Sequence, residues 1–195
     1  MKIIILILTL LLLVGCIEQT NHMDDEMEEE MDEMMGDLQE IVGDPIDEMN
    51  SLVDWRDIEL KDISSQKTFK IYDFKGTPIL LESFAVWCPT CTKQQQEIKK
   101  LHEELGDDLI SISLDTDPNE DETQILNHLT KNGFTWTYAI SPPEITRLLI
   151  AEFGQGVVFA PQAPTILICE DQSARLLKSG VKSVDELKQE IEKGC

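Results

Sequence analysis

Basic residues are scarce in this sequence of 195 residues, which has 16 Lys and Arg against 38 Asp and Glu and a formal net charge of -22 at pH 7. No cluster of bases and no Arg-rich stretch occurs anywhere along it. An acidic surface repels phosphate backbones, so we expect no nucleic-acid partner. Residues 1–50 contain 14 acids and a single base, Lys2, and account for -13 of the net charge.

Histidine is also rare, and the three present, His22, His102 and His128, are scattered. The chain has one Cys-x-x-Cys pair, Cys88 and Cys91, and no second such pair. A structural zinc site needs four ligands, commonly two Cys pairs or a Cys pair with two nearby His. We therefore expect no metal and no bound cofactor, which leaves a structural staple or a redox pair.

No apolar run is long enough for a membrane-spanning helix, which needs about 20 residues. The longest, Ile3 to Val14, is interrupted by a threonine and is followed by Gly15 and Cys16, so residues 1–16 have the pattern of an export signal. The ending "LVGC" resembles the lipobox of exported lipoproteins, which implies lipid on Cys16. An uncleaved anchor with an incidental cysteine is the alternative. Both place the protein outside the cytoplasm, on the outer face of the membrane.

Residues 17–50 are acidic and rich in methionine, and from Asn21 to Asp37 they contain no aromatic, no β-branched residue and no base. Such a stretch buries too little apolar surface to fold alone, so we expect a solvated tether. Methionines at steps of three and four also allow an amphipathic helix, and thioethers allow a copper(I) site. The plain tether is favoured because like charges oppose the helix.

Residues 51–195 are predicted to form one domain, beginning with a β-hairpin from "DIELKDI" and "TFKIYDF". The nearly continuous apolar run "ILLESF", 79–84, predicts a central buried strand, followed by a helix that Gly106 ends. Strands at 109–115 and 134–140 alternate with helices at 121–133 and 142–154. Two further strands and a helix capped by Ser183 complete an α/β fold with a mixed sheet.

Cys88 and Cys91 lie where the strand 79–84 gives way to a helix, and their i, i+3 spacing allows a disulfide. Pro89 suits the first helical turn because its missing N–H would have no partner there. Cys88 would then lie at the positive end of the helix dipole, where a thiolate is favoured. This geometry predicts that Cys88 attacks and that Cys91, one turn further in, resolves the mixed disulfide.

The stretch "GTPILLESFAVWCPTC" resembles the thioredoxin superfamily, and the chain from Trp55 onward is similar to its membrane-tethered branch, which serves cytochrome c maturation or reduces other exported disulfides. The resemblance implies a thioredoxin-like fold with a hairpin extension and a Cys88–Cys91 redox disulfide. It also implies a substrate surface formed by Trp87, Pro89, Thr90, Ala163 and Thr165. The expected partners are disulfide-containing exported proteins and a membrane electron donor, and the expected state is a monomer.

The family carries a cis proline opposite its redox pair, often as Pro-Thr before a strand, and "QAPTILI" offers Pro164 and Thr165. A cis bond there would expose the backbone of Ala163 to a substrate chain. Pro161 is the competitor, but neither a threonine nor a strand follows it. Glu82 lies where thioredoxins carry a buried acid, and strand alternation puts it on the face of Leu80 and Phe84, so we expect it to take the proton of Cys91.

Three questions stay open in the sequence. Cys169 and Cys195 are either paired or free. The direction of electron flow is undetermined, although the resemblance favours a reductant. Two other functions compete: a thiol peroxidase, disfavoured because Ala85 stands where its signature has Thr, and a non-enzymatic copper carrier, disfavoured because such relatives use a wider Cys spacing and a distant His.

Overall fold

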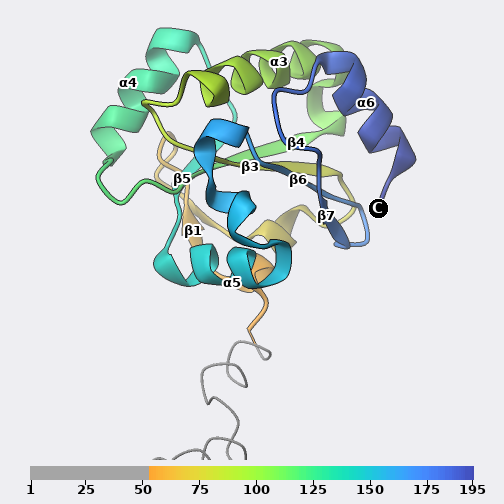
Figure 1. Cartoon of the computed structure of the whole chain (residues 1–195), viewed down its shortest axis with the longest axis horizontal. Coiled ribbons are helices and arrows are strands. Elements are labelled where there is room, and N and C mark those ends of the chain that lie inside the picture. Colours follow the sequence, from red (N-terminus) through yellow and green to blue (C-terminus); the bar gives the residue numbers. More distant parts are fainter. Residues whose placement is uncertain (1–52) are drawn as a thin grey trace, which may run out of the picture. The chain divides into compact units, whose positions relative to one another are not determined.

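A five-stranded mixed sheet forms the middle of residues 53–195, the part of the chain that the computed structural model describes (Figure 1). The expected export signal, tether and lipidated Cys16 lie outside the described residues. The strand order is β5-β4-β3-β6-β7, with bounds β3 Ile79–Phe84, β4 Ile110–Asp115, β5 Thr137–Ile140, β6 Thr165–Ile168 and β7 Ala174–Leu176. Strands β3, β4 and β5 are parallel, whereas β6 runs antiparallel to β3 and β7 antiparallel to β6.

Strand β3 is the central strand, as the run "ILLESF" predicts, and all six of its residues are buried. A strand covered on both faces has no reason to alternate apolar with polar residues. Glu82 and Ser83 are the two polar residues in β3, and the register sets Glu82 between Ser113 of β4 and Thr165 of β6. The acid therefore lies in the interior of the sheet.

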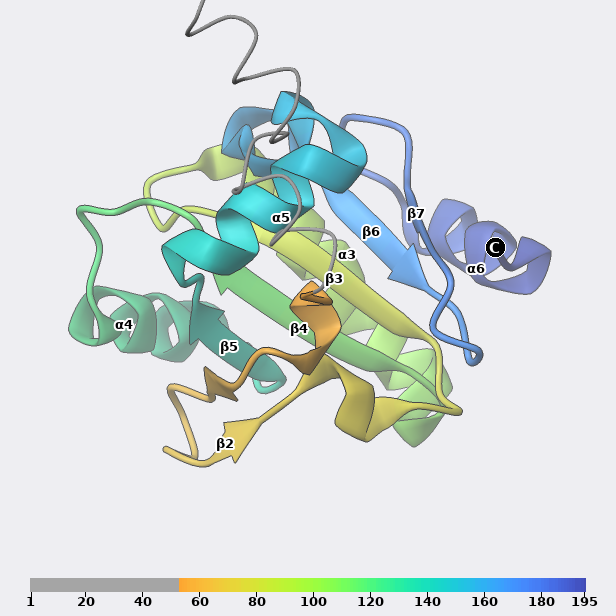
Figure 2. The ribbon, with the colours of Figure 1, turned by 90° about the horizontal axis from the view of Figure 1, so that it is seen from below.

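Three helices cover one face of the sheet and a fourth covers the other (Figures 1 and 2). Helices α3, Pro89–Leu105, α4, Glu122–Asn132, and α6, Val184–Lys193, lie together, and α5, Pro143–Phe153, lies opposite. The expected capping box of α6 is present, with Ser183 and Glu186 exchanging bonds. Gly133 ends α4 at a φ of 67°, a left-handed conformation that glycine adopts without strain.

The core divides according to the two faces of β3. Leu81 belongs to the cluster that packs with Ile145 of α5, whereas Leu80 packs with Leu101 of α3 and Leu187 of α6. Phe84 continues the second face toward α4. This alternation confirms the expectation that Glu82 shares the face of Leu80 and Phe84.

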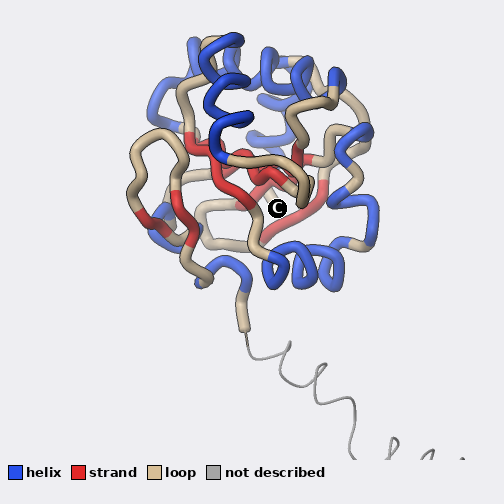
Figure 3. Tube along the Cα trace, turned by 90° about the vertical axis from the view of Figure 1, so that its left-hand side faces the viewer, coloured by secondary structure: helices blue, strands red, loops and turns tan. Residues whose placement is uncertain are grey.

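The predicted N-terminal hairpin is present but shorter than expected. Strands β1, Leu60–Lys61, and β2, Thr68–Phe69, pair antiparallel over two residues each. The rest of "TFKIYDF", predicted as strand, is a 3₁₀ helix, η2, Ile71–Phe74. Just before this helix, the backbone N–H of Lys70 donates to the carboxylate of Asp73. Further 3₁₀ turns are η1 Trp55–Asp57, η3 Gly106–Asp108, η4 Gln155–Val158 and η5 Ala160–Gln162. Figure 3 distinguishes helical, strand and loop segments along the Cα trace. Within residues 53–195, no helix has the length and apolar character needed to cross a bilayer.

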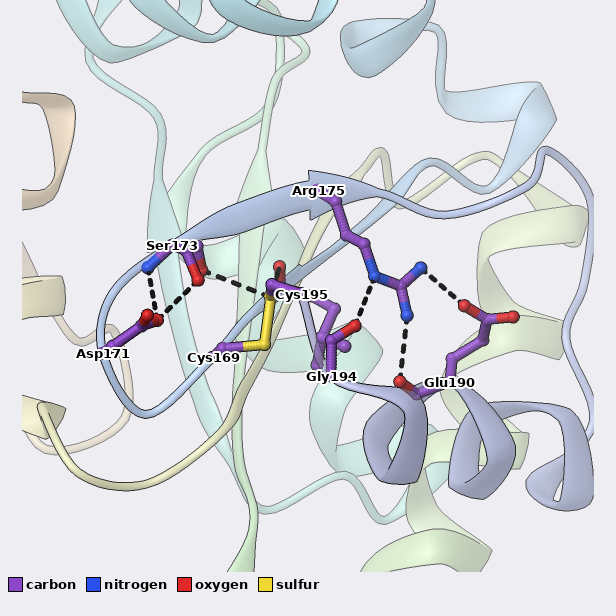
Figure 4. The surroundings of a disulfide bond; sticks show 8 residues. Cys169, Asp171, Ser173, Arg175, Glu190, Gly194 and Cys195 are labelled. Carbon is purple, nitrogen blue, oxygen red and sulfur yellow. Dashed lines mark hydrogen bonds and ion pairs between the residues drawn. A yellow bond between two sulfur atoms is a disulfide. The ribbon is translucent and has the colours of Figure 1, made fainter.

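A disulfide joins Cys169, just after β6, to Cys195, just after α6, which answers one of the questions that the sequence leaves open (Figure 4). Arg175 of β7 holds the same helix end. Its Nε donates to the carbonyl of Gly194 at 2.7 Å, and its guanidinium forms an ion pair with Glu190 at 2.5 Å. The end of α6 is therefore tied to the sheet by one covalent link and by Arg175.

We expect Cys195→Ser to lower the free energy of unfolding. The link spans a sequence separation of 26 residues, and loss of that cross-link frees about 3.5 kcal/mol of chain entropy in the unfolded state. Urea unfolding of the oxidised full chain measures the difference. Under a reductant strong enough to open the disulfide, wild type and variant should unfold together; a difference that persists there would assign the effect to something other than the cross-link.

Candidate redox site

The two cysteines of the Cys-x-x-Cys pair lie at the junction of β3 and α3. The chain leaves β3 through a turn in which the N–H of Cys88 donates to the carbonyl of Ala85 at 3.1 Å. Cys88 is the N-cap of α3 in extended conformation, and Pro89 takes the first helical position. The Cys88 Sγ accepts from the N–H of Cys91 at 3.1 Å, and both thiols are free. The local geometry is the one that the spacing predicts.

Both sulfurs are covered in this state, since Cys88 and Cys91 are each 1% exposed. The Cys91 thiol donates to the carbonyl of Ala160 at 3.1 Å. Burial, the adjacent Cys88 sulfur and the charge of Glu82 raise the pKa of Cys91 well above its usual range. Cys91 is therefore a shielded thiol that holds its proton, as the prediction of a resolving role requires.

Glu82 is buried, as expected, and is 2% exposed. Its Oε1 accepts from the hydroxyl of Ser113 at 2.5 Å and from the amide of Gln95 at 2.8 Å. Burial raises the pKa of Glu82 to about 7, although these two donors and the charge of Lys182 act in the opposite direction. Near neutral pH this carboxyl is poised between its two protonation states.

Lys182 is a buried ammonium beside this site that no sequence signal indicates, because a lysine in the turn "KSGVKS" looks exposed. It is 6% exposed, and its Nζ donates to the carbonyls of Ala163 at 2.8 Å, Gly180 at 2.7 Å and Lys178 at 3.3 Å. Burial lowers its pKa to about 8, against the opposing charge of Glu82. Its backbone exchanges bonds with the Gln94 amide, which anchors it to α3.

His128 extends the hydrogen-bond chain from Glu82 into α4. Its Nε2 lies 2.7 Å from the Gln95 Oε1, while the Trp136 Nε1 donates to the Ser113 hydroxyl at 2.8 Å. Within residues 53–195 no three His, Cys, Asp or Glu side chains group as a metal site would require.

The predicted cis bond before Pro164 is wrong, because the described residues contain no cis peptide bond. Ala163 instead adopts a left-handed conformation, φ 46° and ψ 55°, at the end of η5. Thr165 begins β6, as expected.

The expectation that Ala163 offers its backbone to a substrate is also wrong for this state. Its N–H donates to the carbonyl of Ala160 at 2.8 Å, and its carbonyl accepts from Lys182 and from the Thr165 hydroxyl. Ala163 is 2% exposed. The segment that approaches the redox pair is instead Ala160, whose carbonyl meets Cys91, followed by Pro161, the competitor of Pro164.

A groove runs beside the redox turn, lined by Ala85, Trp87, Thr116, Asp117, Pro118, Val158, Phe159, Ala160 and Pro161. Trp87 is 60% exposed and Phe159 54% exposed, so two large apolar side chains face solvent there. Pro89 is exposed and Thr90 half-buried at the start of α3. An exposed aromatic surface next to a thiol pair is suited to contact another polypeptide chain.

Comparison with known proteins agrees with this geometry. A family model described as Redoxin matches residues 42–184. The chain belongs to the Redoxin family. It also has the thioredoxin-like α/β fold: a DsbF homologue from Corynebacterium diphtheriae superposes with a TM-score of 0.57 at 20% identity, over 70% of this chain and 83% of that one.

Two curated proteins resemble parts of this Redoxin-family chain. The thioredoxin-like protein YneN of Bacillus subtilis is 30% identical over 88 residues, which cover 45% of this chain and 48% of YneN. The thiol:disulfide interchange protein DsbE of Vibrio cholerae is 40% identical over 63 residues, 31% of this chain and 33% of DsbE. The chain thus matches about half of one relative and about a third of the other.

The raised pKa of Glu82 predicts a pH dependence of stability. The folded protein binds this proton more tightly than the unfolded chain, whose pKa is near 4.5, so the stability that Glu82 contributes is fully present below pH 4.5 and is lost as the pH rises through 7. Glu82→Gln, which stays neutral, should flatten this slope in urea unfolding between pH 4.5 and 7. Burial also raises the pKa of Asp115 to about 7, so Asp115 contributes to the slope in both proteins, and the slope should decrease in the variant without disappearing. An unchanged slope would contradict the assignment to Glu82.

Proposed function

We propose that this protein is a thiol-disulfide oxidoreductase that reduces disulfides of exported proteins. The observation that carries the proposal is the pair itself: Cys88 caps α3, and Cys91 lies one turn inside, with its proton retained and an acid of pKa about 7 nearby. That DsbE is named for thiol:disulfide interchange supports this reaction class.

The proposed reaction has two exchanges. The Cys88 thiolate attacks one sulfur of a substrate disulfide, forming a mixed disulfide and releasing the other substrate sulfur as a thiolate. Cys91 then loses its proton, and its sulfur attacks the Cys88 Sγ, which releases the second substrate thiolate and leaves the Cys88–Cys91 disulfide. Two electrons pass to the substrate, and a reduced dithiol donor in the membrane restores the pair.

Glu82 is proposed to take the proton of Cys91 in the second exchange. A carboxyl with a pKa of about 7 is half ionised near neutral pH and returns the proton as readily as it accepts it. Lys182 acts on Glu82 through its charge and holds Ala163 and the strand start behind the pair. The carbonyl of Ala160, which accepts from the Cys91 thiol, has to yield as the proton leaves.

The direction of electron flow is proposed to be toward the substrate. The similarity of the chain from Trp55 onward to the membrane-tethered branch of the thioredoxin superfamily supports this direction. The reduction potential of the pair tests it, because a strong oxidant of this kind stabilises its reduced form.

The site of action is proposed to be the outer face of the cell membrane, with lipid on Cys16 and residues 17–50 as tether. The support is the short apolar run before Cys16 together with the Cys169–Cys195 disulfide, since structural disulfides persist mainly in oxidising compartments.

The order of the two cysteines predicts opposite outcomes for two matched variants. Cys91→Ser should accumulate a mixed disulfide with a disulfide-bonded peptide, because nothing resolves it, whereas Cys88→Ser should form none. Mass spectrometry of the peptide that contains positions 88 and 91, after acid quenching, detects the mixed disulfide in either variant. Equal trapping by the two variants would show that Cys88 is not the attacking sulfur.

The direction of electron flow predicts the reduction potential of the pair. We expect a value near or below about -230 mV for the full chain in thiol buffers, whereas a value near about -120 mV would reverse the direction to an oxidant. Alkylation of the peptide that contains Cys88 and Cys91 measures it without interference from Cys16, Cys169 or Cys195. Absence of any two-electron transition would remove the redox function altogether.

A further inference from the structure

The turn that delivers Cys88 has two backbone N–H groups that the turn itself leaves without an acceptor. Its closing bond runs from the N–H of Cys88 to the carbonyl of Ala85, so the central residues are Val86 and Trp87. The N–H groups of the two central residues of such a turn point outward. The N–H of Val86 is part-buried and needs an acceptor within the protein, whereas the N–H of Trp87 is exposed and has water as an alternative.

Glu120, from the loop between β4 and α4, supplies that acceptor for both groups. Its Oε2 accepts from the N–H of Val86 at 2.7 Å and its Oε1 from the N–H of Trp87 at 3.3 Å. One carboxylate thus spans the two residues immediately before the attacking cysteine, although it is more than 30 positions away in sequence.

The same loop is held against the turn by further contacts. The N–H of Thr116 donates to the carbonyl of Phe84 at 3.1 Å, and Asp117 Oδ2 accepts from the indole Nε1 of Trp87 at 2.6 Å. The buried Asp115 carboxyl accepts from the N–H of Asp117 at 3.0 Å and contacts Glu120. Asp115 thereby holds the loop from its buried side. The loop 116–120 is therefore braced on both sides of Glu120.

We propose that Glu120 is a positioning residue for Cys88. Hydrogen bonds to a charged acceptor are about twice as strong as those between neutral groups, so the carboxylate fixes the turn against rotation and sets both Cys88 and the exposed Trp87 ring relative to the groove. The role rests on the proposed function, since it matters for catalysis only if Cys88 reacts. No signal in the sequence links residue 120 to the redox turn.

The test measures two quantities in Glu120→Ala and in Glu122→Ala, a matched control. Glu122 lies two residues further on and binds Lys61 of the hairpin, away from the turn. The first quantity is the hydrogen-exchange rate of the Val86 and Trp87 amides by NMR. The second is the rate constant for mixed-disulfide formation between Cys88 and a small aromatic disulfide, measured in full chains that carry Cys16→Ser and Cys91→Ser.

We expect Glu120→Ala to speed exchange of both amides and to slow mixed-disulfide formation about tenfold, while Glu122→Ala changes neither. Glu120→Gln, which keeps one acceptor oxygen, should give intermediate values and serves if the alanine variant fails to fold. Rates and amide exchange that match the control, in a folded Glu120 variant, would overturn the positioning role. Failure of the parent chain to form any mixed disulfide would instead overturn the proposed function. Amide exchange would still test whether Glu120 holds the turn.

Discussion

A carboxyl in the interior of the central sheet is the constraint on which much of this structure depends. Removing an ionised acid from water is costly unless donors or an opposite charge compensate it, or a proton neutralises it. Glu82 receives all three kinds of help: donors from Ser113 and Gln95, the charge of Lys182, and a pKa raised to about 7. Each of these partners comes from a different element, so β3, β4, α3 and the loop before α6 meet around one side chain.

This arrangement separates the two cysteines by environment. Cys88 caps the helix at the surface side of the junction and is next to the exposed ring of Trp87, whereas Cys91 faces inward toward Ala160 and the charge of Glu82. In the proposed reaction Cys88 is the sulfur that meets the substrate and Cys91 is the sulfur that stays protonated until a mixed disulfide has formed, and the two environments support that division of roles. Cys88 is nevertheless covered in the described state, so a substrate has to displace its neighbours to reach it.

Much of the fold can be predicted from local pattern, because the signals are local. The unbroken apolar run 79–84 specifies a central strand, and Ser183 with Glu186 specifies where α6 begins. The burial of Glu82 also follows, since alternation along one strand sets its face. Alternation alone overestimates the hairpin, because Lys70 and Asp73 favour a 3₁₀ turn where alternation predicts strand.

The parts of the site that pattern does not reveal all depend on contacts between distant segments. Lys182 and Glu120 look like surface charges in sequence, and their positions follow only from the packing of loops against the redox turn. The geometry before Pro164 depends on similar contacts, since Ala160 and Lys182 engage the N–H and the carbonyl of Ala163 in its left-handed conformation.

Helix α6 connects the Cys169–Cys195 disulfide with the buried Lys182. Its C-terminal end is fixed to the sheet by the Cys169–Cys195 disulfide and by Arg175, and Lys182 lies one residue before its N-cap, where Gln94 of α3 holds it. A helix fixed at both ends cannot slide along α3 without breaking one of these attachments. The disulfide thus helps to hold the buried Lys182 in place, and the charge of Lys182 acts together with the Ser113 and Gln95 donors against the rise that burial causes in the pKa of Glu82.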